Sequence, residues 1–270
     1  MDTFDWLDSI GSTQDELLRR LTDRPDLPHG TAVATADQGA GHGRRGRVWT
    51  APPGSALALS VLLRPTGPAG RLPAVHLSWL SLVAAAAVAG ILEELGADVH
   101  VKWPNDVLAA DGRKMCGILA TLTPDGGVVV GIGVNLDHSG GAPVETATAL
   151  ADWVDAGRVP APRELAVRVR EAVVAASDRL AAELSGVDEP VDGGHPAVAA
   201  VRARLSTVGR TVRAELPGGE VLEAEALGLG PGGTLRVRPL DEGRDRHDRM
   251  EREISAGDVV HLRGDVRRGR

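Results

Sequence analysis

Apolar residues recur at helical spacing in three segments of the chain. Residues 13–21 carry Leu17, Leu18 and Leu21 on one side, with Ser12 or Thr13 in place to cap the first turn. Residues 72–95 form a long, alanine-rich apolar run that stops before Gly96, the residue type that most often ends a helix. The third stripe, in residues 163–184, consists of Leu165, Val169, Val173, Leu180 and Leu184. The spacing therefore predicts three main helices.

Shorter apolar runs bounded by turn residues predict the β-strands. They are residues 31–36, 56–63, 99–103, 116–122 and 128–136. Asp111-Gly112 and Asp125-Gly126-Gly127 are tight-turn sequences, and strands joined by such turns run antiparallel. The pattern predicts an α+β fold with a mixed, largely antiparallel sheet and helices on one face.

The pattern changes at about residue 206. Four short β-prone runs follow, at residues 211–216, 221–229, 235–239 and 259–263, separated by turns rich in glycine and proline. This second pattern predicts a small β-barrel, so we expect one domain over residues 1–205 and another over residues 206–270. Residues 241–253 are nearly all charged and are expected to form a mobile loop.

Composition and charge narrow the class of protein. The chain is 43% hydrophobic and 25% charged, and its net charge of −7 disfavours nucleic acid and anionic membranes as partners. The single cysteine, Cys116, cannot form an intramolecular disulfide, and the first residues lack the features of a signal peptide. The apolar run 77–92 is shorter than the roughly 20 residues of a membrane span. We expect a cytoplasmic protein without a zinc site, since its histidines show no ligand spacing.

Lysine is scarce in this chain. Of the 30 basic residues, 28 are arginines and only Lys102 and Lys114 are lysines. An ammonium group is a compact point charge, whereas a guanidinium group is a broad planar fork. A lysine that persists in so arginine-rich a sequence is there by chance or for a role that arginine cannot fill. The closeness of the two lysines in the sequence favours a role.

A segment rich in glycine and arginine covers residues 39–47, Gly-Ala-Gly-His-Gly-Arg-Arg-Gly-Arg. Its glycines let the backbone approach a ligand closely, and its arginines offer planar forks for phosphate oxygens. This composition predicts an anion-binding loop; the alternative is a flexible basic loop or a nucleic-acid contact. The sequence has no G-x-x-x-x-G-K-[ST] loop, and no G-x-G-x-x-G placed between a predicted strand and helix.

A second polar cluster lies around one predicted strand–turn–strand. It consists of Lys102-Trp103-Pro104-Asn105-Asp106, followed by Arg113-Lys114-Met115-Cys116-Gly117-Ile118-Leu119. Two cations, an amide and a carboxylate suit a reaction in which negative charge develops on a phosphate and a nucleophile must be aligned. The alternative is a solvated hairpin with a proline turn.

The order of the motifs resembles that of the biotin–protein ligases. The chain has Gly11-Ser12-Thr13-Gln14, the Gly-Arg segment ending in Trp49, Lys102-Trp103-Pro104-Asn105-Asp106, Lys114 with Gly117-Ile118-Leu119, and Gly131-Ile132-Gly133-Val134-Asn135. The segment Ser255-Ala256-Gly257-Asp258-Val259-Val260-His261-Leu262-Arg263 also resembles that family's C-terminal module. The resemblance covers nearly the whole chain.

This resemblance implies a class II synthetase-like catalytic domain, an SH3-like barrel and a two-step reaction. The carboxylate of biotin attacks the α-phosphorus of ATP, with Mg²⁺ as cofactor, and gives biotinyl-5′-AMP and pyrophosphate. A lysine of a biotin carboxyl carrier protein then attacks the mixed anhydride and releases AMP. The resemblance also implies a monomer or a weak, ligand-dependent homodimer. Some members carry a DNA-binding helix-turn-helix before the first motif; here that motif begins at Gly11, and we expect no DNA partner.

The resemblance also assigns residues to the two substrates. Biotin would be held by Ser12, Thr13, Gln14, Gln38, Gly41, His42, Arg44, Lys114 and Gly117, with Ser12, Thr13 and Gln38 on its ureido group. ATP would be held by Arg44, Arg47, Trp49, Asn105, Lys114, Asn135 and Arg263. The catalytic set would be Lys114, Arg44, Asp106 and Lys102. Lys114 would bring the biotin carboxylate and the α-phosphate together, while Asp106 would accept the proton of the carrier lysine or ligate Mg²⁺.

Several alternatives remain open for these residues. Ser12 and Thr13 could simply cap a helix, Trp49 could be a core aromatic, and Arg263 could be an exposed terminal residue. The chain also departs from the family, which often has asparagine at the position of Gln14 and arginine at that of His42; we expect both positions to contribute backbone as much as side chain. The competing functions are a lipoate–protein ligase, whose glycine-rich motif is absent here, and an RNA-binding module, disfavoured by the lack of tyrosine.

Overall fold

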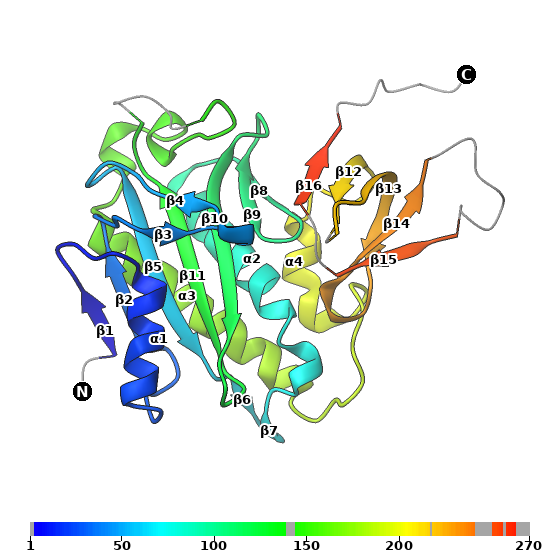
Figure 1. The fold of residues 1–270 in the computed structure, drawn as a ribbon, viewed down its shortest axis with the longest axis horizontal. Coiled ribbons are helices and arrows are strands. Elements are labelled where there is room, and N and C mark those ends of the chain that lie inside the picture. The colour runs from blue at the N-terminus through cyan, green and yellow to red at the C-terminus, as the bar shows by residue number, and fades with distance from the viewer. Residues whose placement is uncertain (1–2, 139–143, 217, 241–249, 256–257, 263–270) are drawn as a thin grey trace.

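The chain folds around two β-sheets of different size (Figure 1). The computed structural model describes residues 3–138, 144–216, 218–240, 250–255 and 258–262. The larger sheet has seven strands in the order β1-β2-β5-β11-β10-β9-β8. In that order they are Phe4–Trp6, Ala32–Thr35, Ala56–Leu63, Val128–Asn135, Lys114–Leu122, Asp106–Ala109 and Val99–Lys102. All neighbouring pairs are antiparallel except β1 with β2, so the predicted mixed, largely antiparallel sheet is confirmed.

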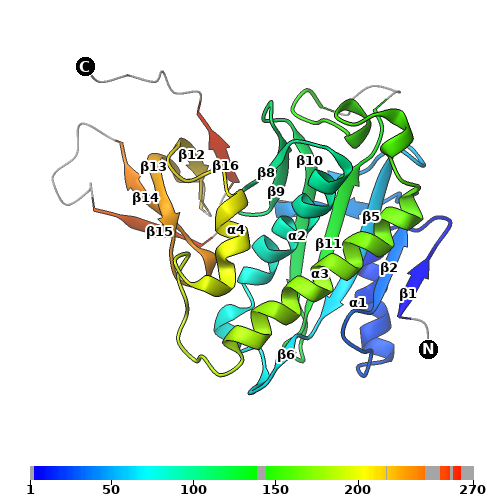
Figure 2. The ribbon, with the colours of Figure 1, turned by 180° about the vertical axis from the view of Figure 1, so that it is seen from behind.

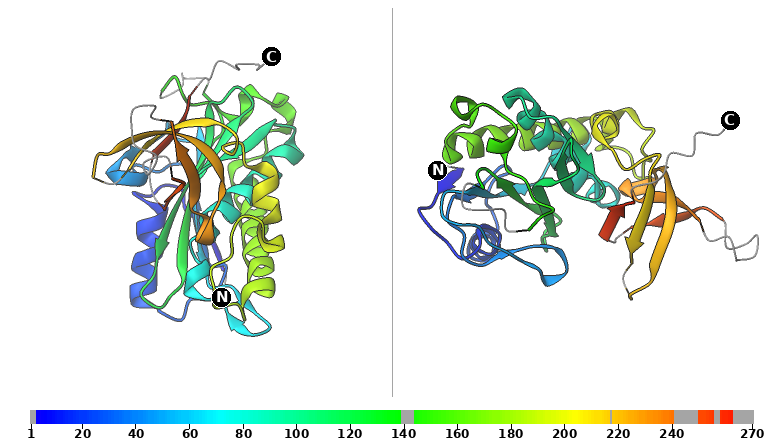
Figure 3. Two further views of the ribbon diagram at one scale, coloured as in Figure 1. Left: turned by 90° about the vertical axis from the view of Figure 1, so that its right-hand side faces the viewer. Right: turned by 90° about the horizontal axis from the view of Figure 1, so that it is seen from above.

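Helices lie on both faces of this sheet (Figure 2; Figure 3). The two long helices α2 (Trp79–Leu95) and α3 (Pro162–Leu184) cover one face, while α1 (Thr13–Asp23) lies on the other. Alternation along β5 explains both contacts, since Leu57, Leu59, Val61 and Leu63 belong to the core under α2 and α3, and Leu62 packs with Leu17 of α1. The predicted α+β class is confirmed, but the expectation that the helices lie on one face of the sheet is wrong, because α1 packs on the opposite face through Leu17.

Two elements around the larger sheet differ from what the sequence predicted. The long helix was predicted from residue 72, but α2 begins at Trp79 and follows a 3₁₀ turn at Ala74–His76. Proline at position 73 precedes this turn, and the wholly buried His76 ring hydrogen-bonds the carbonyl of Val187 at 2.7 Å, so the segment serves a tertiary contact. The turn predicted at Pro104-Asn105-Asp106 is shorter than expected, because Asp106 already begins strand β9 opposite Lys102.

The smaller sheet follows the order β15-β14-β13-β12-β16. Its strands are Arg252–Ile254, Leu235–Pro239, Val221–Leu229, Thr211–Glu215 and Asp258–His261. Part of the charged segment predicted as a loop is therefore strand β15, where Arg252 pairs with Glu220 at 2.8 Å. Residues 241–249 of that segment lie outside the described residues.

Residues 205–207 join the two sheets. They run beside the edge strand β8, where Leu205 bridges Val101 in parallel and Ser206 N–H donates to the Val101 carbonyl at 2.9 Å. The hydroxyl oxygen of Thr207 accepts from the backbone N–H of Trp103, and the Trp103 indole N–H donates to the carbonyl of Gly233 in the loop before β14, both at 2.9 Å. The smaller sheet is thus tied to the turn that carries Asn105 and Asp106. The division of the chain into domains at residue 205 stays a prediction.

The remaining elements are short. They are β6 (Thr66–Gly67), β7 (Gly70–Arg71), α4 (Ala199–Arg204) and 3₁₀ turns at Leu150–Asp152, Ala156–Arg158, Pro196–Val198 and Pro231–Gly233. None of the helices within the described ranges has the length and apolar character that crossing a bilayer requires.

Candidate active site

A hairpin arm crosses the face of the larger sheet that α1 only partly covers (Figure 1). The arm, residues 39–49, consists of β3 (Gly41–His42), a 3₁₀ turn at Arg44–Gly46 and β4 (Val48–Trp49). Its root is fixed by backbone hydrogen bonds, from Gly39 N–H to the Ile10 carbonyl at 3.0 Å and from Ala40 N–H to the Gly11 carbonyl at 2.7 Å. The segment predicted as an anion-binding loop is therefore an ordered hairpin, which begins beside the N-terminus of α1.

Small residues form the floor beneath this arm. On the α1 face, strands β5 and β11 carry Leu62 and Val129 where α1 packs. Further along the same face, the residues are Ala56, Ala58 and Ser60 on β5, Gly131 and Gly133 on β11, and Gly117 on β10. A β-carbon at Gly133 would lie 2.9 Å from the Trp49 ring, so the indole rests on bare backbone. The change from large to small residues leaves room for a ligand between arm and sheet.

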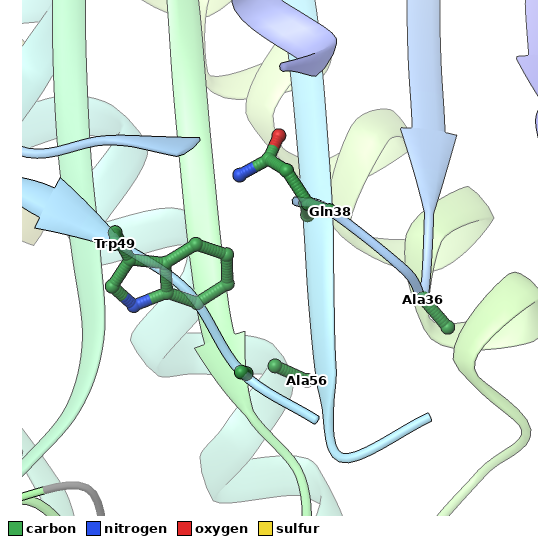
Figure 4. Close-up of a pocket in the computed structure, with 6 residues that line it drawn as sticks. Ala36, Gln38, Trp49 and Ala56 are labelled. Atoms are coloured by element: carbon green, nitrogen blue, oxygen red, sulfur yellow. The ribbon is translucent and has the colours of Figure 1, made fainter. Parts of the chain in front are cut away.

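Thr13, Gln38 and Ser60 form a hydrogen-bonded group at the N-terminus of α1. Thr13 donates to Oε1 of Gln38 from its backbone N–H at 2.8 Å and from its hydroxyl at 3.2 Å. The Thr13 hydroxyl also lies 2.9 Å from that of Ser60. Gln38 and Trp49 extend from separate segments into the space in front of β5, beside Ala36 and Ala56 (Figure 4). These residues line a small pocket that combines amide groups with apolar walls.

Ser12, Gln14 and Gly41 surround this group. The Ser12 hydroxyl accepts from Asp15 N–H at 3.2 Å, so it caps α1, as one sequence alternative held. Gln14 turns toward β10, where its Nε2 donates to the hydroxyl of Thr121 at 2.7 Å. A β-carbon at Gly41 would lie 2.5 Å from the backbone carbonyl oxygen of Trp49 and would also meet Nε2 of Gln38, so glycine is required there.

The two lysines converge on one carboxylate. Nζ of Lys114 lies 2.6 Å from Oδ1 of Asp106, and Nζ of Lys102 lies 3.9 Å from Oδ2. The Lys114 side chain runs over Gly117, because a β-carbon at Gly117 would lie 2.8 Å from Nζ. Asn135 holds the strand beneath by donating from Nδ2 to the carbonyls of Lys114 at 3.3 Å and Thr148 at 2.9 Å. The scarce lysines of the sequence thus meet at one place.

The tip of the arm reaches the turn before β9. Nη1 of Arg44 donates to Oδ1 of Asn105 at 3.2 Å, across 61 positions of sequence. Asn105 is buried, and its Nδ2 donates to the carbonyl of Ile118 on β10. The Gly-Arg segment and the Lys-Trp-Pro-Asn-Asp block, far apart in sequence, therefore form one site.

His42 and Arg47 lie on the more exposed parts of the arm. Nε2 of His42 lies 2.8 Å from Oδ2 of Asp15 in the first turn of α1. Arg47 folds back within the arm, donating from Nε to the Arg44 carbonyl at 3.3 Å. Arg263, the last residue of the predicted set, lies outside the described residues.

Two groups near the site have shifted pKa values. Complete burial raises the pKa of the Cys116 thiol to about 12, so this residue is a packed side chain and no nucleophile. At the junction with the smaller sheet, burial, the cations of Lys102 and Arg210 and the neighbouring His100 lower the pKa of His261 to about 4. His261 is therefore neutral beside Lys102, and it pairs with the Thr207 hydroxyl at 3.1 Å.

A cleft of about 330 Å³ opens beside the arm tip, between the turn at Trp103–Asn105 and the loop before β14. It is lined by residues of strand β10, by the loop segments next to β14 and β15, and by Ser78 and Ser81 near the start of α2. Arg44 and Asn105 border it, so a cation and an amide of the site face an opening. Within the described part of the chain, no three histidine, cysteine or acidic side chains gather as a metal-binding group.

Three residues of the site, Ser60, Asp15 and Thr207, were not among those predicted from the sequence. Ser60 had a usable signal, because it is the only polar residue in the apolar run 56–63. Asp15 and Thr207 had none, since their partners are set by how the arm and the smaller sheet pack.

Comparison with known proteins agrees with this geometry. A model of the biotin/lipoate A/B protein ligase family matches residues 6–138. The chain is 36% identical over 258 residues to the biotin–[acetyl-CoA-carboxylase] ligase of Mycobacterium tuberculosis, covering 94% of this chain and 86% of that relative. It is also 43% identical to the bifunctional ligase/repressor BirA of Escherichia coli over 133 residues. This match covers 47% of this chain and 38% of that protein.

Solved structures show the same fold. The biotin protein ligase from Aquifex aeolicus in complex with biotin and ATP matches with a TM-score of 0.67 at 23% identity, covering 98% of this chain and 100% of that one. The biotin protein ligase from Leishmania major in complex with biotinyl-5-AMP matches with a TM-score of 0.57 at 23% identity, covering 94% and 98%.

Proposed function

This chain belongs to the family of biotin–protein ligases, and we propose that it activates biotin with ATP and transfers the biotin to a lysine of a biotin carboxyl carrier protein or domain. The observation that carries the proposal is the convergence of Lys114, Lys102 and Asp106 under an arm that holds Arg44 over the same strands. Cationic groups lie at one end of a floor of small residues, and the Thr13–Gln38 pocket lies at the other. This arrangement suits a ligand with a polar ring and a carboxylate tail.

In the first step, the carboxylate of biotin attacks the α-phosphorus of ATP and pyrophosphate leaves. Two anions must approach each other, and their repulsion opposes the step. Lys114 extends over Gly117 with 46% of its side chain exposed, so its ammonium can move from Asp106 to the substrates. Arg44, held at the arm tip, offers a fork for the phosphate oxygens that gain charge.

In the second step, the amine of the carrier lysine attacks the acyl carbon of biotinyl-5′-AMP. The carbon–oxygen bond to phosphate breaks, AMP leaves, and the nitrogen loses a proton. Asp106 is the carboxylate beside Lys114 and is our proposed acceptor for that proton. Asn105, fixed by Ile118 and Arg44, keeps the adjoining turn in place.

The donor set near the phosphates fits Mg²⁺ that enters with ATP. Mg²⁺ is commonly bound by one or two carboxylates together with substrate phosphates and water. Asp106 supplies such a carboxylate and Asn105 supplies an amide oxygen, and both would hold the ion. The ion would neutralise phosphate charge, and the residue chemistry above does not depend on its position.

The polar pocket favours biotin over lipoate, the other substrate in the name of the matching family. The ureido ring of biotin offers a carbonyl and two N–H groups to the amide and hydroxyl groups of Gln38 and Thr13. The dithiolane ring of lipoate has no carbonyl for the Nε2 donor of Gln38, and leaving that donor without a partner would cost roughly 1–3 kcal/mol.

A transfer assay tests the proposal. The protein is incubated with ATP, Mg²⁺, a biotin carboxyl carrier domain and either biotin or lipoate, and the intact mass of the carrier is measured. We expect one biotinyl group on the carrier and no lipoyl group. An unmodified carrier after incubation with active substrates, or lipoyl transfer in preference to biotinyl transfer, contradicts the proposal.

A further inference from the structure

Ser60 is a polar side chain buried in an otherwise apolar strand. It is 0% exposed, and its neighbours along the same face of β5 are Ala58 and Leu62. A buried hydroxyl without a partner costs about 1–3 kcal/mol, whereas an alanine here would match the small residues beside it. The packing of the sheet does not need the Ser60 hydroxyl. The hydrogen-bond partner of this hydroxyl is the hydroxyl of Thr13, 2.9 Å away.

The direction of this hydrogen bond follows from the proton count. A threonine hydroxyl has one proton, and that of Thr13 points to Oε1 of Gln38. Thr13 must then accept from Ser60, which gives a chain of donors from Ser60 through Thr13 to Gln38. Chained hydrogen bonds of this kind polarise one another.

The chain fixes the orientation of the Gln38 amide. Its Oε1 receives the N–H and the hydroxyl of Thr13, so its Nε2 faces the other way. Nε2 lies close above the backbone of Gly41, on the side of the pocket where Trp49 lies (Figure 4). Nε2 of Gln38 therefore presents an N–H donor to the pocket in a fixed orientation. A carbonyl group of a ligand requires such a donor.

We infer that Ser60 is a positioning residue for substrate recognition, which acts through Thr13 to hold the Gln38 amide in the orientation that reads the ureido group of biotin. The inference rests on the proposed function and adds to it the residue beneath the pocket. Ser60 is wholly buried and its hydroxyl is hydrogen-bonded to Thr13, so its role is to position the groups that meet the ligand.

A mutant cycle on biotin-dependent exchange of pyrophosphate into ATP tests this role. Ser60→Ala should raise the KM for biotin about three- to tenfold, with the KM for ATP and kcat unchanged within about twofold. Thr13→Val should raise the KM for biotin at least as much. The double variant should match Thr13→Val, because the effect of Ser60 passes through Thr13. Additive effects, or equal rises in both KM values, would overturn the inference.

Substrate analogues provide a second, independent test of the role of Ser60. Dethiobiotin keeps the ureido ring, whereas diaminobiotin lacks the ureido carbonyl. Ser60→Ala should weaken dethiobiotin as much as biotin and leave the inhibition constant of diaminobiotin unchanged. Equal weakening of all three ligands would show a general loss of pocket shape and contradict the inference.

A matched control separates this effect from folding. Ser177 is also 0% exposed, and its hydroxyl bonds within α3 to the Val174 carbonyl at 2.8 Å, away from the pocket. Ser177→Ala should leave the KM for biotin unchanged. Should Ser60→Ala fold poorly by thermal melting, Ser60→Cys fills the position with a slightly larger side chain and a weaker donor, and should show the same selective rise. If the wild-type protein shows no biotin-dependent exchange, the proposed function is contradicted. If the wild type is active but the effects of the Ser60 and Thr13 substitutions are additive, only the positioning role of Ser60 is contradicted.

Discussion

Nζ of Lys114 lies 2.6 Å from Oδ1 of Asp106, and the same carboxylate also faces Lys102. Without substrates, Asp106 thus supplies the negative charge that biotin and ATP would supply during the reaction. The Lys114 side chain can reach this position because Gly117, over which it passes, has no side chain. The relationship explains why a glycine stands three positions after the lysine.

Gly117→Ala should therefore lower activity without unfolding the protein. A β-carbon there would lie 2.8 Å from Nζ of Lys114, which is the far end of a flexible side chain and can shift away. We expect kcat for biotin-dependent pyrophosphate exchange to fall about tenfold or more, with little change in melting temperature. Gly228→Ala, in β13 with no heavy atom within 4 Å of the added carbon, is the control and should change neither quantity. Full activity in Gly117→Ala would contradict the proposed path of Lys114.

The hydrogen bond between the His42 ring and the Asp15 carboxylate should slow the opening of the arm. It joins β3 to the first turn of α1 at 2.8 Å, but both side chains are largely exposed, so its contribution is about 0.2–1 kcal/mol. His42→Ala should speed the release of biotinyl-5′-AMP up to about fivefold in a stopped-flow chase. Asp15→Asn should have the same effect, and His42→Arg should keep the slow rate.

Arg19→Ala is the matched control for that experiment. Arg19 forms exposed ion pairs with Glu16 and Asp23 on the same helix. Its loss should leave the release rate unchanged. Equal acceleration by Arg19→Ala would show that the arm responds to the stability of α1 and not to the His42–Asp15 contact.

Ligands should protect the arm from proteolysis. Several glycines make its ordering costly in conformational entropy, and phosphate and carboxylate groups would supply partners for its arginines. We expect trypsin to cut within residues 39–47 more slowly when biotin and ATP are both present. The cleavage site is read by mass spectrometry, and an unchanged cutting rate would speak against closure over the substrates.

Stability should fall in mild acid because of His261. Its pKa is lowered from 6.5 to about 4, by burial and by nearby cations. Between these values the unfolded chain binds a proton that the folded protein does not, so the free energy of unfolding decreases as the pH falls from 6.5 toward 4. His261→Gln removes this titration while keeping a partner for Thr207. Urea unfolding should then show a weaker pH dependence for the variant; identical slopes would contradict the assignment.

The sequence predicted much of this fold because its signals are local. The alternation and turn signals of residues 99–136 predicted the antiparallel strands β8, β10 and β11, and the leucine spacing of residues 13–21 predicted α1. The start of α2 was missed because a buried hydrogen bond of His76, set by tertiary packing, overrides the apolar pattern. The face on which α1 lies was also not readable from its own sequence.

The site was predictable as two clusters but not as one place. Glycine, arginine and lysine composition marked the arm and the Lys-Trp-Pro-Asn-Asp block separately, and the resemblance to a family put them together. The contact of Arg44 with Asn105 depends on how the arm crosses the sheet, which no local pattern encodes. The roles of the individual residues in binding and catalysis stay predictions until they are measured.

Biotin-dependent exchange of labelled pyrophosphate into ATP, compared between wild type and Lys114→Ala, tests the central claim most directly. In the proposed mechanism, the Lys114 ammonium brings two anions together in the adenylation step. We therefore expect rapid exchange in the wild type, and at least about a hundredfold slower exchange in a Lys114→Ala protein that still melts normally. Exchange at the wild-type rate in Lys114→Ala would contradict this mechanism.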